Sequence, residues 1–155
     1  YGRMFGLRTA SLRQSSVYGP HQHPRSDQGW VAHLVGEALA GRQIALNGVG
    51  KQVRDLLHAT DLARLFVALA ESVDPGVGYQ LNVGGGMGND LSILELFAWL
   101  AERTGQEVDF VTGPTRPSDQ LVFVSDNVRV GELTGWSPQV TLEAGLTALL
   151  EASAE

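Results

Sequence analysis

Two arginines stand close to aspartates in polar stretches of the chain: Arg54 is followed directly by Asp55, and Arg116 comes shortly before Asp119. A guanidinium group offers a planar fork of N–H donors that matches the oxygens of a phosphate, and a neighbouring carboxylate can orient it or accept from a sugar hydroxyl. Two such forks would suit a nucleotide diphosphate. The residue spacing alone favours a simpler alternative, in which both arginines form local salt bridges on the surface.

A glycine-rich run, Gly84-Gly85-Gly86-Met87-Gly88, follows a predicted strand and precedes a predicted helix, as the turn of a dinucleotide site does. The spacing does not match that fingerprint, because the third glycine of G-x-G-x-x-G would fall on Asn89 and the helix starts only after Leu91. We therefore predict a flexible strand-to-helix turn in which glycine supplies positive φ angles.

The histidines form no recognisable metal motif. His21 and His23 make an H-x-H pair in a loop without a third ligand at helical spacing, His33 and His58 stand elsewhere, and no H-E-x-x-H occurs. The chain also lacks the G-x-S-x-G turn of a serine hydrolase. These patterns favour neither a metal enzyme nor a hydrolase.

Alternating strands and helices are predicted to position these residues. Helical signals cover the end of a helix at 1–7 closed by Gly6, a helix at 30–40, one starting at Thr60, one running from a Ser92–Glu95 capping box to Gly105, a short one from Ser125 or Asp126 to 133, and a last one starting at Thr141. Strand signals cover 9–12, 44–46, 53–57, 79–83, 107–111 and 121–124, with 44–46 and 53–57 joined as a hairpin or as strand, loop and strand. Polar loops are expected at 15–27 and 112–120. This alternation indicates an α/β fold.

The composition is that of one globular domain. The chain has 155 residues, of which 43% are hydrophobic and 18% are charged, and this balance differs from that of disordered chains. The net charge of -6 argues against a nucleic-acid-binding surface, and no apolar stretch reaches the ~20 residues that cross a bilayer. The absence of cysteine excludes disulfides and agrees with a cytoplasmic location. Because residue 1 is Tyr and not Met, we expect a piece of a longer protein.

Several stretches, in this order, resemble one family of enzymes. They are Arg13-Gln14-Ser15-Ser16-Val17-Tyr18-Gly19, Asp27-Gln28-Gly29-Trp30-Val31, Gly48-Val49-Gly50-Lys51-Gln52-Val53-Arg54-Asp55-Leu56-Leu57-His58, Arg116-Pro117-Ser118-Asp119-Gln120 and Gly135-Trp136-Ser137-Pro138. The series resembles the C-terminal half of the extended short-chain dehydrogenase/reductases, the NAD-dependent nucleotide-sugar epimerases and dehydratases. Serines at Ser15 and Ser16, where most of that superfamily has Phe and Asn, are most similar to the branch that epimerises CDP-linked sugars.

The resemblance implies the organisation and the activity of the protein. It implies an α/β fold that is the C-terminal part of an extended Rossmann-type protein, in which residues 1–155 form a single substrate-binding portion with a few strands of the parallel sheet. The NAD-binding N-terminal half would lie outside this chain. The implied parent is a homo-oligomeric isomerase that binds a nucleotide-diphosphate sugar, and its NAD takes a hydride from a sugar carbon, C2 by preference, and returns it to the opposite face.

The resemblance also implies the site residues. Arg54 and Arg116 would grip the substrate diphosphate, and Asp119 would hold Arg116 or a ribose hydroxyl. The other residues implied on the substrate side are Ser16, Gln28, Trp30 and, beside the base, Asn47. The residues implied to lie where the backbone passes the nicotinamide are Gln14 and Ser15.

The chain departs from the family in its catalytic groups. Family members abstract a proton with the Tyr of a Y-x-x-x-K motif, whose Lys lowers the pKa of that Tyr. Here the only lysine is Lys51, and the residue four positions before it is Asn47. We therefore expect no catalytic residue and no turnover by this chain alone. The open alternatives are a nucleotide-sugar 4,6-dehydratase or 4-epimerase as the parent, and a non-catalytic nucleotide-binding or interaction module.

Overall fold

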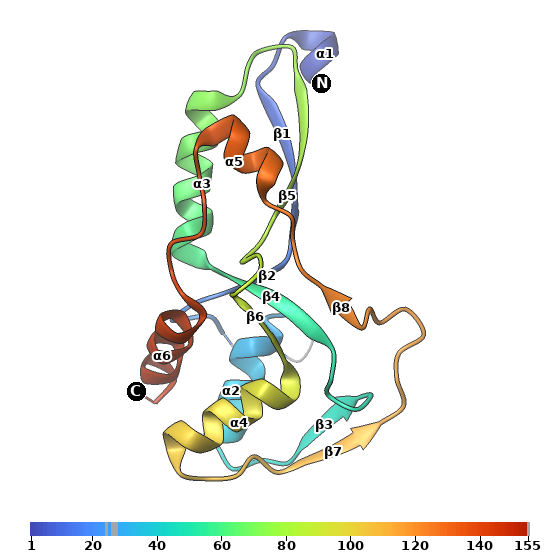
Figure 1. The fold of residues 1–155 in the computed structure, drawn as a ribbon, viewed down its shortest axis with the longest axis vertical. Helices are drawn as coiled ribbons and strands as arrows, with labels where there is room; N and C mark the ends of the chain where they lie inside the picture. Colours follow the sequence, from blue (N-terminus) through green and yellow to red (C-terminus); the bar gives the residue numbers. More distant parts are fainter. Residues whose placement is uncertain (24, 26–27, 155) are drawn as a thin grey trace.

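The structure is a computed structural model that describes residues 1–23, 25 and 28–154. Its helices are α1 (Gly2–Phe5), α2 (Trp30–Leu39), α3 (Ala59–Ser72), α4 (Ile93–Thr104), α5 (Val128–Thr134) and α6 (Leu142–Ser153). Its strands are β1 (Thr9–Gln14), β2 (Ser16–Tyr18), β3 (Ile44–Asn47), β4 (Val53–His58), β5 (Gly78–Val83), β6 (Asp90–Ser92), β7 (Phe110–Gly113) and β8 (Val122–Phe123). Strands and helices alternate along most of the chain (Figure 1), which confirms the predicted α/β class.

The strands pair in three groups. β1 pairs in parallel with β5, from Thr9 opposite Gly78 to Gln14 opposite Val83. In the second group β2 and β8 run parallel to β4, and β6 runs antiparallel to it. The third group is the parallel pair of β3 and β7. Since β3 and β4 belong to different groups, the predicted hairpin is wrong and the alternative of strand, loop and strand is confirmed.

Two clusters of buried apolar side chains hold the helices on these strands. In the upper part of Figure 1, α3 and α5 lie beside β1 and β5, and the cluster there includes Leu65 of α3 and Leu81 of β5. In the lower part, α2 and α4 lie near β3, and the second cluster joins Val35, Leu96 and Leu146 of α2, α4 and α6. Burial of such side chains is the main stabilising term of the fold.

Several predicted helix boundaries are confirmed. The Ser92 hydroxyl accepts from the Glu95 N–H at 3.2 Å, and the Glu95 carboxylate accepts from the Ser92 N–H at 2.6 Å, so the capping box of α4 is closed. Gly105 ends α4 with a left-handed φ of 70°, a conformation that a glycine adopts without steric cost. Thr141 caps α6 by accepting from the N–H of Ala144.

Other local predictions are wrong where pairing across the chain decides the outcome. The expected loop at 15–27 contains β2, because this short segment finds a parallel partner in β4. The strand predicted at 107–111 is β7, which begins later and pairs with β3. The N-cap of α3 is His58, whose Nδ1 accepts from the Thr60 N–H, so Thr60 lies inside the helix. α5 follows Asn127, later than either predicted cap.

Replacing Ser92 with Ala is expected to lower the free energy of unfolding by about 1 kcal/mol at neutral pH. The change leaves the first turn of α4 without its cap and removes a hydroxyl that donates to Glu95 at 2.7 Å. The hydroxyl and the N–H of Ser92 lower the pKa of Glu95. The stabilisation from this carboxylate is therefore complete at pH values above the ordinary pKa of a glutamate. It is lost as the pH falls through the lowered pKa of Glu95.

Urea unfolding of the wild type and of Ser92→Ala, near neutral pH and in acid, measures the contribution of the cap to the free energy of unfolding. The difference between the forms should shrink in acid. A difference that does not change with pH would contradict the role of Glu95, and no difference at neutral pH would contradict the cap itself.

Candidate functional site

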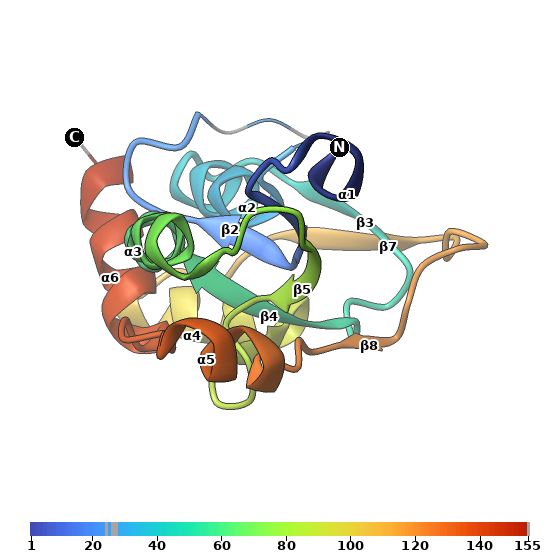
Figure 2. The same cartoon turned by 90° about the horizontal axis from the view of Figure 1, so that it is seen from above.

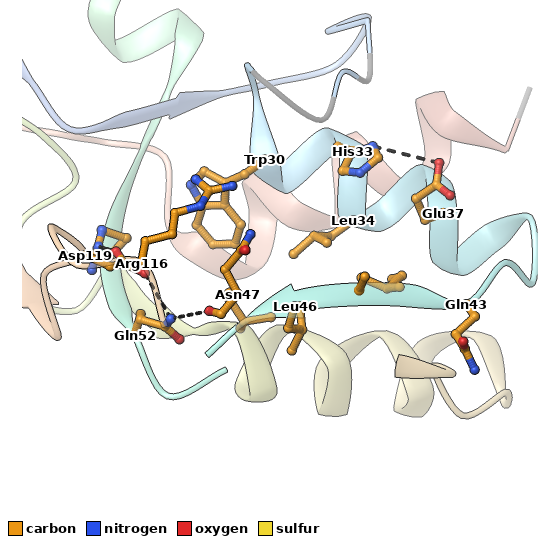
Figure 3. Close-up of a pocket in the computed structure, with 14 residues that line it drawn as sticks. Trp30, His33, Leu34, Glu37, Gln43, Leu46, Asn47, Gln52, Arg116 and Asp119 are labelled. Atoms are coloured by element: carbon orange, nitrogen blue, oxygen red, sulfur yellow. Dashed lines mark hydrogen bonds and ion pairs between the residues drawn. The ribbon is translucent and has the colours of Figure 1, made fainter. Parts of the chain in front are cut away.

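A cavity of about 520 Å³, here called the main cavity, lies between α2 and β3. Arg54 of β4 and Arg116 both line it, although they are far apart in the sequence. Figure 3 shows Trp30 on α2 and Asn47 at the end of β3 at the same end of the cavity as Arg116 and Asp119. The structure therefore gathers five of the residues named from the sequence around one cavity.

The connection between β7 and β8, residues 114–121, supplies Arg116 and Asp119. It projects away from α6 in both views of the fold (Figures 1 and 2). A turn in which the Asp119 N–H donates to the Arg116 carbonyl at 3.0 Å sets the two side chains on one short segment. The pairing of β8 with β4 then brings the end of this connection next to Arg54.

Asp119 holds Arg54 in place. Arg54 Nη2 donates to Asp119 Oδ1 at 2.7 Å, and Arg54 Nη1 donates to the Val53 carbonyl at 2.8 Å. Only 21% of the Arg54 side chain and 23% of the Asp119 side chain are exposed, so this ion pair is largely shielded from water. Of the two predicted roles of Asp119, the contact with Arg116 is not found, because the pairing of β8 with β4 places Asp119 beside Arg54. The other role, a hydrogen bond to a ribose hydroxyl, stays a prediction.

Gln52 is a site residue that the sequence reasoning missed. Its Nε2 donates to Asp119 Oδ2 at 3.0 Å and to the Asn47 carbonyl at 2.7 Å, and the residue is 7% exposed. The amide thereby fixes Asp119 relative to the end of β3. Its place directly before β4, two residues before Arg54, was the available signal, because alternate residues of an extended segment share one face.

Arg116 differs from Arg54 in having no acceptor among the residues that the structure describes. The Arg116 residue is exposed. It lines the main cavity together with Trp30. Figure 3 shows the Arg116 side chain extending toward the end of α2 that carries Trp30. A guanidinium with five N–H donors and no acceptor among the described residues is available to bind an anion in this space.

A second cavity, of about 390 Å³, adjoins the first. Its lining residues are Gln14, Ser15, Ser16, Arg54, Gln120 and Phe123. Arg54 lines both cavities and therefore stands at their boundary. Gln28 is exposed and lines neither cavity, so its predicted place in the cleft is not supported; Asp27 lies outside the described residues.

Asp55 points away from Arg54 into the interior, contrary to the predicted local pairing. It is 0% exposed, and its carboxylate accepts from the Gly86 N–H at 2.9 Å and from the Ser125 N–H at 3.1 Å. The Ser15 hydroxyl donates to the same carboxylate and also, at 2.8 Å, to the Asp55 carbonyl. One buried carboxylate thus ties three separate segments together behind the second cavity.

The glycine run packs against this carboxylate. Gly86 and Gly88 have positive φ angles of 72° and 93°, as predicted. Gly84 and Gly85 are instead buried where the chain passes close to β4, and a methyl group on Gly84 would overlap the carboxylate of Asp55. The predicted flexible turn is therefore a packed corner at these two positions.

The far end of the main cavity holds an ion pair. Glu37 accepts from Arg42 Nε and Nη2, both at 2.8 Å, and this contact lowers the pKa of Glu37. The charge that favours an anionic ligand is therefore at the other end, where Arg116 lines the cavity without an acceptor among the described residues. Within residues 1–23, 25 and 28–154, no three His, Asp or Glu side chains gather as metal ligands would, and no helix is long and apolar enough to span a membrane.

Comparison with known proteins agrees with the resemblance seen in the sequence. The model of the NAD dependent epimerase/dehydratase family matches residues 1–84. CDP-paratose 2-epimerase of Salmonella typhi is 37% identical over 97% of this chain and 46% of its own length, and UDP-glucose 4-epimerase of Mycolicibacterium smegmatis is 32% identical over 97% and 47%.

A solved structure extends the likeness to the fold. UDP-glucuronic acid 4-epimerase from Bacillus cereus, in complex with UDP-glucuronic acid and NAD, matches 97% of this chain and 46% of its own with a TM-score of 0.84 and 27% identity. The present chain spans about half the length of the proteins it matches. The fold is that of the corresponding part of a Rossmann-type enzyme, and the chain belongs to the NAD dependent epimerase/dehydratase family.

Proposed function

We propose that this chain is the nucleotide-sugar-binding portion of an NAD-dependent nucleotide-sugar epimerase of the CDP-paratose 2-epimerase type. One observation carries the proposal: Arg54 and Arg116, from separate elements, line one cavity, and Arg116 has no acceptor among the described residues. Charge-assisted hydrogen bonds from guanidinium groups to phosphate oxygens are strong and geometrically specific. The 37% sequence identity with the Salmonella 2-epimerase favours a 2-epimerase over a 4-epimerase or a 4,6-dehydratase.

The two cavities suggest how the ligand is arranged. The diphosphate would lie at Arg54 and Arg116, with Asp119 and Gln52 keeping Arg54 in a fixed orientation. The nucleoside would occupy the main cavity, with its base near Asn47. The sugar would enter the second cavity, because Arg54 stands at the boundary between the two.

NAD fits the same corner from the other side. β1 and β5 are parallel, and their carboxyl ends lead to Gln14 and to the glycine run behind the second cavity, where parallel sheets bind dinucleotides. Gln14 and the backbone of Ser15 would border its nicotinamide, since the Ser15 hydroxyl is already used by Asp55. When bound, NAD supplies the hydride acceptor that a reversible oxidation of the sugar requires.

The described residues bind and orient the sugar, and the proton transfer needs groups that this sequence lacks. A Y-x-x-x-K pair and a G-x-x-G-x-x-G loop are absent from the 155 residues. We therefore propose that the chain binds nucleotide sugars without turning them over. Residues 1–155 would form a single substrate-binding portion that works together with an NAD-binding half. A homo-oligomeric state and a cytoplasmic location are part of the same proposal.

Calorimetric titration of the 155-residue chain with CDP-glucose, UDP-glucose and dTDP-glucose tests the binding function. We expect measurable binding of at least the CDP form, and we expect Arg54→Ala and Arg116→Ala each to weaken it by about 1.5–3 kcal/mol, or about tenfold to about 150-fold. Arg103→Ala is the matched control, because Arg103 bonds Glu143 outside both cavities. Equal binding by the wild type and both variants would exclude this site.

A 4-epimerase is the second candidate, favoured by the UDP-glucose 4-epimerase relative. The titration separates the two, because a 4-epimerase of that kind should bind UDP-glucose more tightly than CDP-glucose.

A further inference from the structure

We propose that Trp30 is a positioning residue that links the two cavities: its indole N–H holds the Ser16 hydroxyl so that Ser16 donates a hydrogen bond to an oxygen of the sugar. This inference rests on the proposed function and deepens it. It assigns a role to a contact between two side chains that line different cavities.

The direction of the hydrogen bond at Ser16 follows from its partner. Trp30 Nε1 lies 2.9 Å from Ser16 Oγ, and an indole N–H can only donate, so the Ser16 oxygen accepts. The hydrogen of that hydroxyl has no acceptor among the residues that the structure describes. Because Ser16 lines the second cavity, its remaining donor is available to a ligand there.

The neighbouring serine provides a contrast. The Ser15 hydroxyl donates to the carboxylate and the carbonyl of Asp55 and is therefore used inside the protein. Both serines line the second cavity, but the Ser15 hydroxyl already donates to Asp55, whereas the Ser16 hydroxyl donates to no described residue. The residue pair Ser15 and Ser16 alone does not reveal this difference; the position of Trp30 does.

Trp30 is well placed to hold a hydroxyl in a fixed direction. It is the first residue of α2, and the next turn of the helix is anchored by the buried side chains of Val31, Leu34 and Val35. The indole itself is partly buried against the same core and lines the main cavity. Its ring therefore borders the nucleotide side of the site, while its N–H reaches the sugar side.

A sugar oxygen is the acceptor that this geometry favours over a phosphate oxygen. Arg54 marks the boundary of the two cavities and would hold the diphosphate there. The group that continues past the diphosphate into the second cavity is the sugar, whose hydroxyl and ring oxygens accept hydrogen bonds. Trp30 thus acts on the sugar through Ser16.

Binding of CDP-glucose and of CDP to the 155-residue chain, measured by calorimetry, tests the proposal. The readout is the dissociation constant of CDP divided by that of CDP-glucose. This ratio isolates the contribution of the sugar from that of the nucleotide. Trp30→Phe keeps an aromatic ring and removes the N–H, and Ser16→Ala removes the hydroxyl. We expect each variant to reduce the ratio about three- to tenfold, as for one neutral hydrogen bond.

Three further variants make the result specific. The double variant should lose no more than Ser16→Ala alone, because the two residues act through one hydrogen bond. Ser16→Thr, which keeps a hydroxyl, should restore most of the ratio. Trp99→Phe is the control, since its indole donates to Glu143 at 2.7 Å away from both cavities.

The outcomes separate the two proposals. If Trp30→Phe and Ser16→Ala bind both ligands with the same ratio of dissociation constants as the wild type, the role of Trp30 is overturned. The proposed function then stays in place. An equal loss for both ligands, with no change in the ratio, assigns Ser16 to the phosphates and also overturns the inference. Absence of binding by every nucleotide overturns the proposed function and this inference with it. If Trp30→Phe does not fold, Ser16→Ala against Ser16→Thr decides the role of the hydroxyl.

Discussion

Replacing Asp55 with Asn is expected to lower the free energy of unfolding by on the order of 3 kcal/mol. The carboxylate is fully buried and accepts from Gly86, Ser125 and Ser15. An amide of the same shape has only one acceptor oxygen, so its NH2 group must face at least one of these donors. Gly86 and Ser125 donate to the same carboxylate oxygen, so the NH2 group would face the Ser15 hydroxyl, and all three contacts would lose the negative charge that strengthens them.

Urea unfolding followed by circular dichroism measures this loss. Asp74→Asn is the control, because Asp74 is an exposed aspartate that accepts a hydrogen bond from Tyr79 and keeps an acceptor when it becomes an amide. The control should stay within about 0.5 kcal/mol of the wild type. A loss below about 1 kcal/mol in Asp55→Asn would show that the three donors find other partners.

The effect of Asp55 extends to the candidate site through its neighbours. Arg54 precedes it on β4, and successive strand residues face opposite sides, so a carboxylate anchored in the interior fixes the side on which the guanidinium emerges. Ser15, held by the same carboxylate, sets the wall of the second cavity. Asp55 therefore supports both halves of the site without touching the space that a ligand would occupy.

Local sequence rules predicted the elements that depend on local contacts. The capping box at Ser92 and Glu95 and the stop at Gly105 each depend on groups within a few residues of one another, and both are found in the structure. The predicted convergence of Arg54 and Arg116 on one cavity came from the resemblance to a family, because their spacing alone favoured surface salt bridges.

The parts that were missed depend on pairing between distant segments. The contact of Asp119 with Arg54 was not predicted, because it is created when β8 joins β4, a pairing that no local pattern reveals. β2 was missed for the same reason, since three residues become a strand only beside β4. Gln52 stands two residues before Arg54, but its contact with Asp119 joins segments 67 residues apart, so its role appears only once its amide is seen between Asn47 and Asp119.

The glycine run shows the same limit in another form. A glycine is recognised in a sequence by its freedom to adopt positive φ, and this is its role at Gly86. At Gly85 the backbone angle is outside that region, and what matters is the absence of a side chain against β4. Close approach between two backbone segments cannot be predicted before the segments are placed.

Replacing Gly85 with Ala is therefore expected to destabilise the fold by about 3 kcal/mol, at the upper end of the range for overpacked substitutions. The new methyl group would overlap the carbonyl of Leu56 on β4 and lie 2.9 Å from the Cβ of Asn89. A flexible side chain could move aside, but a strand backbone cannot do so without breaking its hydrogen bonds, among them the 2.8 Å bond from the Val53 N–H to the Leu121 carbonyl. β4 would shift, and with it Arg54.

Gly78→Ala is the matched control, because the methyl group there meets nothing within 4 Å and the φ angle of Gly78 lies outside the left-handed region. That variant should be neutral or stabilising by up to about 1 kcal/mol, through the reduced freedom of the unfolded chain. Thermal unfolding of the two variants beside the wild type measures both effects, and titration with CDP-glucose under conditions where Gly85→Ala remains folded should show weaker binding. Similar stability of the two variants would mean that the corner beside β4 is looser than its packing indicates, and that Gly85 is not required for the position of Arg54.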